Sequence, residues 1–223
     1  MTKKIASRMI VLTVALLTAF TLSLTAQALP KPVEALFQEG DLIFQRSQSS
    51  QAQAIYEATG SHWTHVGMLV KESGVWKVYE AIQPVTVTGL DRWVGRGVSG
   101  HVRVMRPKIL ESGAIAENVR KVKKAMATYF GKSYDIFFEW SDDKIYCSEL
   151  VYKSYERALG VRLGDIQQWK DLNLEGPAVK KLIHDRLTKY GKELDLEQLI
   201  ITPVAQMESN ELRKIYESPG SIP

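Results

Sequence analysis

The sequence predicts an α+β domain in which helices pack on one side of a mostly antiparallel sheet. Apolar runs of strand length gather in the first half of the chain, helical patterns gather in the second half, and a short polar turn joins two adjacent strand-like runs. Strands followed by helices, without regular alternation, are typical of this class. A length of 223 residues favours one domain over several.

The first 28 residues carry the pattern of a secretory signal peptide. Cations at Lys3, Lys4 and Arg8 precede an uncharged apolar run from Met9 to Leu24, and residues 26–28 read Ala-Gln-Ala. The alternative is an uncleaved membrane anchor, but the apolar run is shorter than the roughly 20 residues that a spanning helix needs. We therefore predict a signal peptide over 1–28, a single mature domain over 29–223, and a secreted or periplasmic location.

The charge of the mature chain argues against a nucleic-acid partner. The formal net charge is +4, and removal of the three cations in residues 1–28 leaves +1. No stripe of Lys and Arg remains to follow a phosphate backbone. The chain has one cysteine, Cys147, so it has no intramolecular disulfide. A lone cysteine in an exported protein is a candidate reactive thiol, and a small buried hydrophobe is the alternative.

Five segments are predicted to be strands because they are short, apolar-rich and bounded by turn residues. They are Gly40–Phe44, His65–Val70, Val75–Ala81, Pro84–Thr88 and His101–Met105. The segment Lys71–Gly74 between the second and third of them has the composition of a hairpin turn.

Four segments are predicted to be helices, three of them in the second half. A short one covers Gln51–Ala58, with Gly60 past its end, and a longer one covers Ile115–Phe130 and stops at Gly131. The next begins near Cys147 and stops at Gly160, and the last runs from Pro177 to Gly191.

The position of Cys147 favours a nucleophile. A polar turn, Ser141–Lys144, precedes it and a helical apolar stripe follows it, so the thiol is expected in the first helical turn. The positive end of the helix dipole lowers the pKa of a thiol there. The unpartnered N–H groups of the same turn can stabilise the oxyanion of a tetrahedral intermediate.

A thiol hydrolase also needs an imidazole and a group that orients it. If Val70 pairs with Val75 across the predicted hairpin, then His65 pairs with Glu80, and directly paired residues share one face of a sheet. This pairing predicts a base and its orienting carboxylate, whereas an ordinary polar pair on a sheet surface is the alternative. His62 and His65 point to opposite faces of a strand, so we predict no metal site.

Several motifs in order resemble the YiiX branch of the NlpC-type papain-like cysteine hydrolases. They are residues 40–44 (GDLIF), 64–68 (THVGM), 78–81 (VYEA), 131–135 (GKSYD), 140–143 (WSDD) and 146–149 (YCSE), and the resemblance runs from about Gly40 to Pro203. It implies a circularly permuted papain-like fold. It also implies that Cys147 is the nucleophile, His65 the base and Glu80 the third polar residue.

Together with the predicted signal peptide, the resemblance implies an exported enzyme that cleaves an amide through a thioester, in a cell-wall (peptidoglycan) peptide or an acyl amide. No cofactor is expected. A lipid or acyl-ester hydrolase, or an acyltransferase, on the same triad is the nearest alternative, and a non-catalytic binding module is the second. Tyr134, Tyr146 and Trp63 are candidate substrate contacts, with packed aromatic residues as the alternative. The oligomeric state and the role of the segment after Ala205 are left open.

Overall fold

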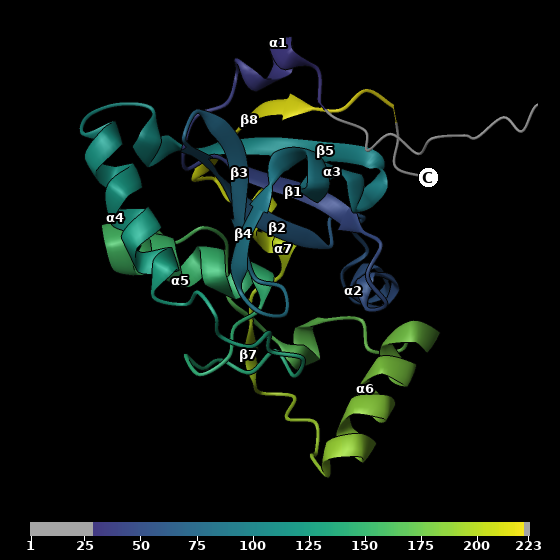
Figure 1. The fold of residues 1–223 in the computed structure, drawn as a ribbon. Coiled ribbons are helices and arrows are strands. Elements are labelled where there is room, and N and C mark those ends of the chain that lie inside the picture. Colours follow the sequence, from purple (N-terminus) through teal and green to yellow (C-terminus); the bar gives the residue numbers. More distant parts are fainter. Residues whose placement is uncertain (1–28, 221–223) are drawn as a thin grey trace, which may run out of the picture.

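The computed structural model describes residues 29–220, so the predicted signal peptide lies outside the described residues. Its centre is a six-stranded sheet in the order β4-β3-β2-β1-β5-β8 (Figure 1). Every neighbouring pair in that sheet is antiparallel, as predicted. Its strands are β1 Leu42–Ser47, β2 His65–Glu72, β3 Val75–Glu80, β4 Thr86–Gly89, β5 Gly97–Pro107 and β8 Leu212–Glu217. A small second sheet pairs β6 Gln167–Gln168 with β7 Leu199–Ile200.

The longer helices follow the first five strands of the sheet in the chain, in agreement with the α+β prediction. The helices are α1 Lys31–Glu34, α2 Ala52–Thr59, α3 Leu90–Gly95, α4 Ile115–Ala127, α5 Cys147–Leu159, α6 Pro177–Tyr190 and α7 Pro203–Met207, with 3-10 turns η1 at Lys108–Leu110 and η2 at Trp169–Asp171. Figure 1 shows α4 and α5 side by side against the sheet, while α6 extends away from it beside α2. None of the helices in residues 29–220 has the length and apolarity needed to cross a membrane.

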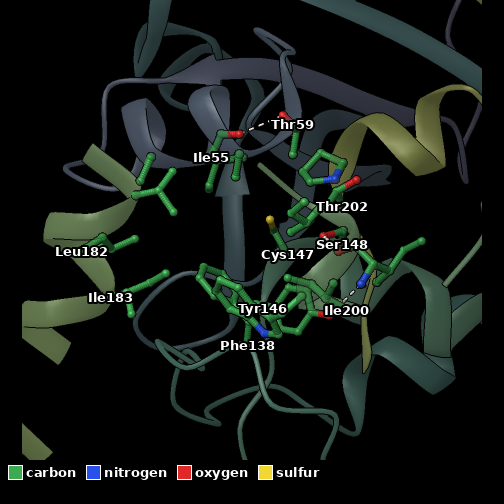
Figure 2. Close-up of a pocket in the computed structure, with 17 residues that line it drawn as sticks. Ile55, Thr59, Phe138, Tyr146, Cys147, Ser148, Leu182, Ile183, Ile200 and Thr202 are labelled. Carbon is green, nitrogen blue, oxygen red and sulfur yellow. Dashed lines mark hydrogen bonds between the residues drawn. The ribbon is translucent and has the colours of Figure 1, made fainter. Parts of the chain in front are cut away.

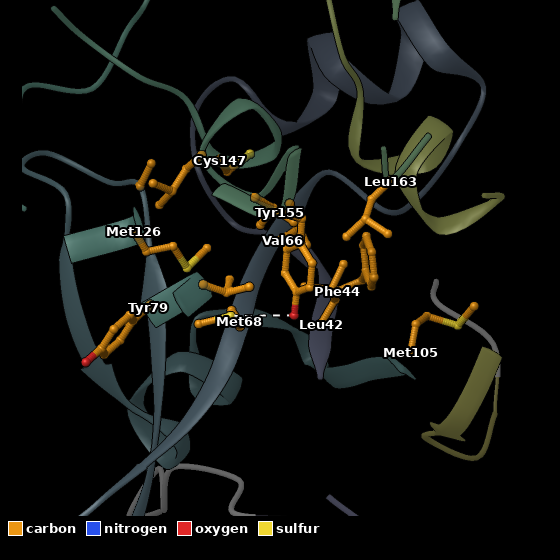
Figure 3. Packing of buried hydrophobic residues seen from close by; sticks show 14 of the residues in the cluster. Leu42, Phe44, Val66, Met68, Tyr79, Met105, Met126, Cys147, Tyr155 and Leu163 are labelled. Atoms are coloured by element: carbon orange, nitrogen blue, oxygen red, sulfur yellow. Dashed lines mark hydrogen bonds between the residues drawn. The ribbon is translucent and has the colours of Figure 1, made fainter. Parts of the chain in front are cut away.

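Two faces of the sheet are buried, whereas the sequence predicted helices on one side. One face, which includes Phe44 and Met68, packs against α4 and α5 (Figure 3). The opposite face, which includes Ile43 and Leu69, packs against α3 and the segment that follows Leu29. Adjacent residues of a strand point to opposite faces, so a continuous apolar run in one strand supplies buried side chains to both faces.

The β2–β3 hairpin has a tighter turn than the sequence predicted. Glu72 pairs with Val75, so only Ser73 and Gly74 form the loop, and both have positive φ (50° and 81°). This is the geometry of a two-residue turn whose twist matches that of the strands. The predicted pairing of Val70 with Val75 is therefore wrong by two residues, because Val70 pairs with Lys77. A shift by an even number keeps every side chain on its predicted face.

Helix boundaries agree with the glycine signals in three of four cases. Gly60, Gly160 and Gly191 follow α2, α5 and α6 in the left-handed conformation. Helix α4 is the exception, because it ends at Ala127 and not at Phe130. The N–H groups of Tyr129 and Phe130 instead reach back three residues, to Met126 and Ala127, and form a tighter turn before Gly131.

The segment after Ala205, for which the sequence offered no prediction, completes the sheet. Strand β8 pairs with the outer edge of β5, and α7 packs against α5. Asp41, which directly precedes β1, accepts a hydrogen bond from the backbone N–H of Gln38 at 2.8 Å. It also forms a two-pronged ion pair with Arg106, at 2.7 and 2.8 Å. Asp41 therefore ties the start of β1 to β5.

Candidate active site

Cys147 occupies the first turn of α5, where the sequence placed it. The preceding residue, Tyr146, is extended (φ −106°, ψ 171°), so the helix begins at the cysteine itself. The side chain is almost completely buried, and its sulfur lies near the backbone N–H groups of Val66 and Ser148. Burial alone would raise the pKa of the thiol, but these donors and His65 lower it below its ordinary value. The site therefore favours the thiolate, which is the nucleophilic form.

His65 is the first residue of β2 and lies between Cys147 and Glu80. Its Nε2 is 2.7 Å from Oε2 of Glu80, and its ring also interacts with the cysteine. A carboxylate can only accept hydrogen bonds, so Nε2 carries the proton and Nδ1 remains for exchange with the thiol. The ring also stacks on Trp93, with centroids 5.8 Å apart. The imidazole is thus held in one tautomer and one orientation.

Glu80 is completely buried and has a full set of donors. Besides His65, Thr88 donates to Oε1 at 2.5 Å, Trp93 donates to Oε2 at 3.0 Å, and Arg96 forms an ion pair with Oε1. Burial would raise the pKa of this carboxyl, yet hydrogen bonds and the charges of His65 and Arg96 lower it to about 2. Glu80 is therefore ionised at neutral pH and fixes a negative charge behind the imidazole.

Thr88, Trp93 and Arg96 were missed by the sequence analysis. Thr88 lies in β4, Trp93 lies in α3, and Arg96 directly follows α3. No motif connects them with Glu80 in the sequence, and the only available signal was their closeness to it along the chain. Their convergence depends on α3 folding back over the sheet face that carries His65 and Glu80.

Gly67 explains how His65 and Glu80 meet although they are not directly paired. A Cβ at Gly67 would lie 2.4 Å from Cγ1 of Val78 and 3.4 Å from Cβ of Glu80. Because glycine leaves this place empty, the Glu80 side chain can cross it toward His65, which lies two residues away on the same face. The predicted contact is present, but as a diagonal contact made possible by a glycine.

The pKa of His65 favours an ion pair with the cysteine. Burial disfavours the charged imidazolium, but hydrogen bonds and charges from Cys147 and Glu80 outweigh it and raise the pKa of His65 to about 9. The lowered pKa of the Cys147 thiol and the raised pKa of the His65 imidazole both favour a thiolate–imidazolium pair. Such a pair combines a charged nucleophile with an acid that can protonate a leaving group.

Tyr134, a predicted substrate contact, lies beside the Cys147–His65 pair, which we call the dyad. Its hydroxyl accepts a hydrogen bond from Nε2 of Gln51 at 2.8 Å and interacts with the cysteine sulfur. Burial, followed by the charge of Cys147, raises the pKa of Tyr134 well above its ordinary value, so the phenol keeps its proton. The O–H group can therefore donate to the thiolate or to an oxyanion formed beside it.

Two cavities of opposite character open beside the dyad. The first, a narrow slot of about 50 Å³, reaches Cys147 and Tyr146 and is lined mainly by apolar residues of α2, α6 and the segment at 200–203. Figure 2 shows the sulfur of Cys147 pointing into the space between Ile55 on one side and Ile183 on another. The second cavity, of about 610 Å³, reaches His65 and Tyr134 and is lined largely by polar residues.

The structure separates the other two predicted substrate contacts. The ring of Tyr146 lines the slot, while its hydroxyl accepts a hydrogen bond from the backbone N–H of Ile201 at 3.1 Å. Trp63 lines neither cavity and packs beside His101, with the guanidinium of Arg103 over its ring. The structure therefore does not bring Trp63 to the site.

The fold and the site together define a papain-like cysteine hydrolase in which histidine and carboxylate precede the cysteine along the chain. Comparison with known families agrees, because residues 36–216 match the family described as "Permuted papain-like amidase enzyme, YaeF/YiiX, C92 family". The chain belongs to this family. The permuted papain-like fold and the likeness to YiiX that the sequence predicted are thereby confirmed.

Two relatives illustrate the likeness. The uncharacterised protein YiiX of Escherichia coli K12 is 40% identical over 178 residues, which is 80% of this chain and 85% of the relative. A crystal structure of YiiX from Escherichia coli O157:H7, described as a metalloprotein, has a TM-score of 0.75 and 40% identity and covers 81% of this chain and 97% of that one. Within residues 29–220 of the present protein, no three His, Cys, Asp or Glu side chains are placed to hold a metal ion.

Proposed function

We propose that this protein is an exported cysteine amidase in which Cys147 is the nucleophile, His65 the general base and acid, and Glu80 the residue that orients His65. Its family comprises permuted papain-like amidases, which supports a hydrolase. The observation that carries the residue roles is the chain of contacts from a thiol at a helix N-terminus, through a buried imidazole, to a fully ionised carboxylate. A binding module would have no need of this arrangement.

The reaction begins with attack of the Cys147 thiolate on the amide carbonyl carbon. The developing oxyanion is stabilised by N–H groups of the first turn of α5 and by the hydroxyl of Tyr134. The His65 imidazolium then gives its proton to the leaving nitrogen as the C–N bond breaks, which leaves a thioester on the cysteine. His65, now neutral, takes a proton from water, and the resulting attack releases the acid and restores the pair.

The substrates that we propose are cell-wall peptides or acyl amides, outside the cytoplasm after cleavage of residues 1–28. The same triad would also serve an ester hydrolase or an acyltransferase, because both proceed through the same thioester. These two alternatives differ in the final acceptor, which is water in one and a second substrate in the other.

The direct test is to capture the thioester. Purified protein (residues 29–223) is incubated with N-acyl amides and with peptidoglycan peptides, and intact mass spectrometry is used to find an acyl adduct that maps to Cys147. The adduct and the hydrolysis product are expected with the parent protein and absent from Cys147→Ala. Hydrolysis that persists in Cys147→Ala would exclude the cysteine as the nucleophile.

A further inference from the structure

A series of hydrogen bonds connects helix α6 with the nucleophile. Nη2 of Arg186, on α6, donates to Oε1 of Gln51 at 2.8 Å, and Nε2 of Gln51 donates to the hydroxyl oxygen of Tyr134 at 2.8 Å. The Tyr134 hydroxyl in turn interacts with the sulfur of Cys147. Gln51 lies 83 residues from Tyr134 and 135 residues from Arg186 along the chain, so the tertiary fold brings these side chains together.

The chemistry of the three side chains fixes the direction of each hydrogen bond in this series. A guanidinium has donors and no acceptor, so the Gln51 amide must present its carbonyl oxygen to Arg186. The NH2 group of the amide then faces Tyr134, and the phenolic oxygen accepts a hydrogen bond from it. The hydrogen of the phenol is left to point away from Gln51, and Cys147 is the group beside it.

Arg186 is itself held by the segment that carries Tyr134. Its Nη1 donates to the backbone carbonyl of Ile136, and its guanidinium lies over the ring of Phe138, 5.4 Å from the centroid. The side chain is half-buried, whereas Lys181 on the same helix is exposed. The guanidinium is therefore held in one place by a carbonyl group and an aromatic ring.

Gln51 and Arg186 also make the Tyr134 phenol a better donor. Burial and the charge of Cys147 raise the pKa of Tyr134, whereas the hydrogen bond from Gln51 and the charge of Arg186 act in the opposite direction. Both residues therefore stabilise negative charge on the phenolic oxygen. A more acidic phenol donates a stronger hydrogen bond to an oxyanion.

We propose that Gln51 and Arg186 are positioning residues of the active site. Arg186 fixes the orientation of the Gln51 amide, and the amide turns the Tyr134 O–H group toward Cys147 and the oxyanion that forms there. This inference rests on the proposed thiol amidase activity, in which Tyr134 stabilises the oxyanion. It makes the reaction depend on α6, although Gln51 and Tyr134 separate Arg186 from the reacting atoms.

The sharpest test reverses the hydrogen bond between positions 51 and 134. In Gln51→Glu the carboxylate accepts from Arg186 as the amide does, but it cannot donate to Tyr134. The phenol must then donate to the carboxylate, which turns its hydrogen away from Cys147. With 4-nitrophenyl butanoate as the probe, kcat should fall by about tenfold or more with little change in KM, as it should in Tyr134→Phe.

Substitution of Arg186 tests the outer end of the series. In Arg186→Met the Gln51 amide loses the cation that fixes its orientation, so kcat should fall by about two- to tenfold, as for the loss of one hydrogen bond. Arg186→Lys keeps a donor in the same place and should restore part of that loss. Lys181→Met is the matched control, because it removes an exposed cation of α6 that pairs with Asp185, and its kcat should equal that of the parent.

Double substitutions separate positioning from a general structural role. If Gln51 and Arg186 act by orienting the Tyr134 hydroxyl, neither Gln51→Glu nor Arg186→Met should lower kcat further in Tyr134→Phe, which lacks the hydroxyl. A structural defect, or the negative charge that Gln51→Glu introduces, would lower kcat by the same factor in both backgrounds. Equal factors would therefore overturn the inference.

The remaining outcomes separate this inference from the proposed function. If the parent hydrolyses the ester and Gln51→Glu retains the kcat of the parent, the inference is overturned and the thiol hydrolase stands. If the parent neither hydrolyses the ester nor becomes acylated at Cys147, both are overturned. Thermal melting shows whether each variant is folded, and the comparison of Arg186→Met with Arg186→Lys provides the same test if Gln51→Glu does not fold.

Discussion

The strongest prediction concerns the charge of Glu80, which the Glu80→Gln substitution removes while its shape is retained. The pKa of His65 stands at about 9 against an ordinary 6.5. Such a rise corresponds to roughly 3 kcal/mol in favour of the imidazolium. Cys147 and Glu80 share this stabilisation. If Glu80 supplies a third to a half of it, the substitution lowers the pKa of His65 by roughly one unit.

The direction of the effect on the catalytic pair follows from the protonation states of His65 and Cys147. Because the pKa of His65 is raised, the imidazolium is fully present below pH 6.5 and is lost as the pH rises through about 9. In Glu80→Gln this loss begins at lower pH. Within the pair, a less basic imidazole returns the shared proton to Cys147 more often, so the fraction of thiolate falls. The thiolate–imidazolium pair is therefore less populated in Glu80→Gln than in the parent near neutral pH.

The assay is the rate at which iodoacetamide labels Cys147, measured from pH 5 to 10, which requires no knowledge of the substrate. At pH 6 an unperturbed thiol, with a pKa of about 8.5, is well under 1% ionised, so the parent should react much faster than a free thiol. Labelling of Glu80→Gln near neutral pH should be slower than that of the parent, by at most about tenfold for each unit by which the pKa of His65 falls. Labelling of His65→Ala should slow further, because the cation is absent.

The control is Glu72→Gln. The Glu72 carboxylate lies on the same hairpin but away from the dyad, and it accepts hydrogen bonds from Lys77 and Tyr79. Its labelling profile should match that of the parent. Identical profiles for the parent, Glu80→Gln and His65→Ala would refute the ion-pair reasoning. An apparent pKa above 8 for the cysteine of the parent would do so as well.

Three further predictions follow from single contacts. Tyr134→Phe should lower kcat for amide hydrolysis by roughly tenfold or more with little change in KM, because one oxyanion donor is lost; an unchanged kcat would remove that role. Asp41→Ala should lower the free energy of unfolding in urea by about 3 kcal/mol, because it leaves Arg106 without its anion; a loss below about 1 kcal/mol would show that the pair contributes as little as an exposed one. N-terminal sequencing of protein from a fractionated cell should begin near Leu29, and a start at Met1 in the membrane fraction would show an anchor.

The sequence by itself determined those parts of the fold and site that depend on neighbours along the chain. The polar turn before Cys147 and the apolar stripe after it located the helix N-terminus that activates the thiol. The apolar runs on both sides of the Ser73–Gly74 turn identified the hairpin and placed His65 and Glu80 on one face. Glycines that adopt positive φ ended α2, α5 and α6, because a residue without Cβ takes that conformation most easily.

Only the tertiary structure decided which distant groups meet at the site. The turn is two residues shorter than composition indicated, so the contact of His65 with Glu80 depends on the empty place at Gly67. The donors Trp93 and Arg96 reach Glu80 because α3 covers the second face of the sheet. The slot and the polar cavity likewise form between segments far apart in the chain, such as α2 and α6. Packing between such segments carries no periodic signal, so local patterns predict the catalytic groups while the fold determines what surrounds them.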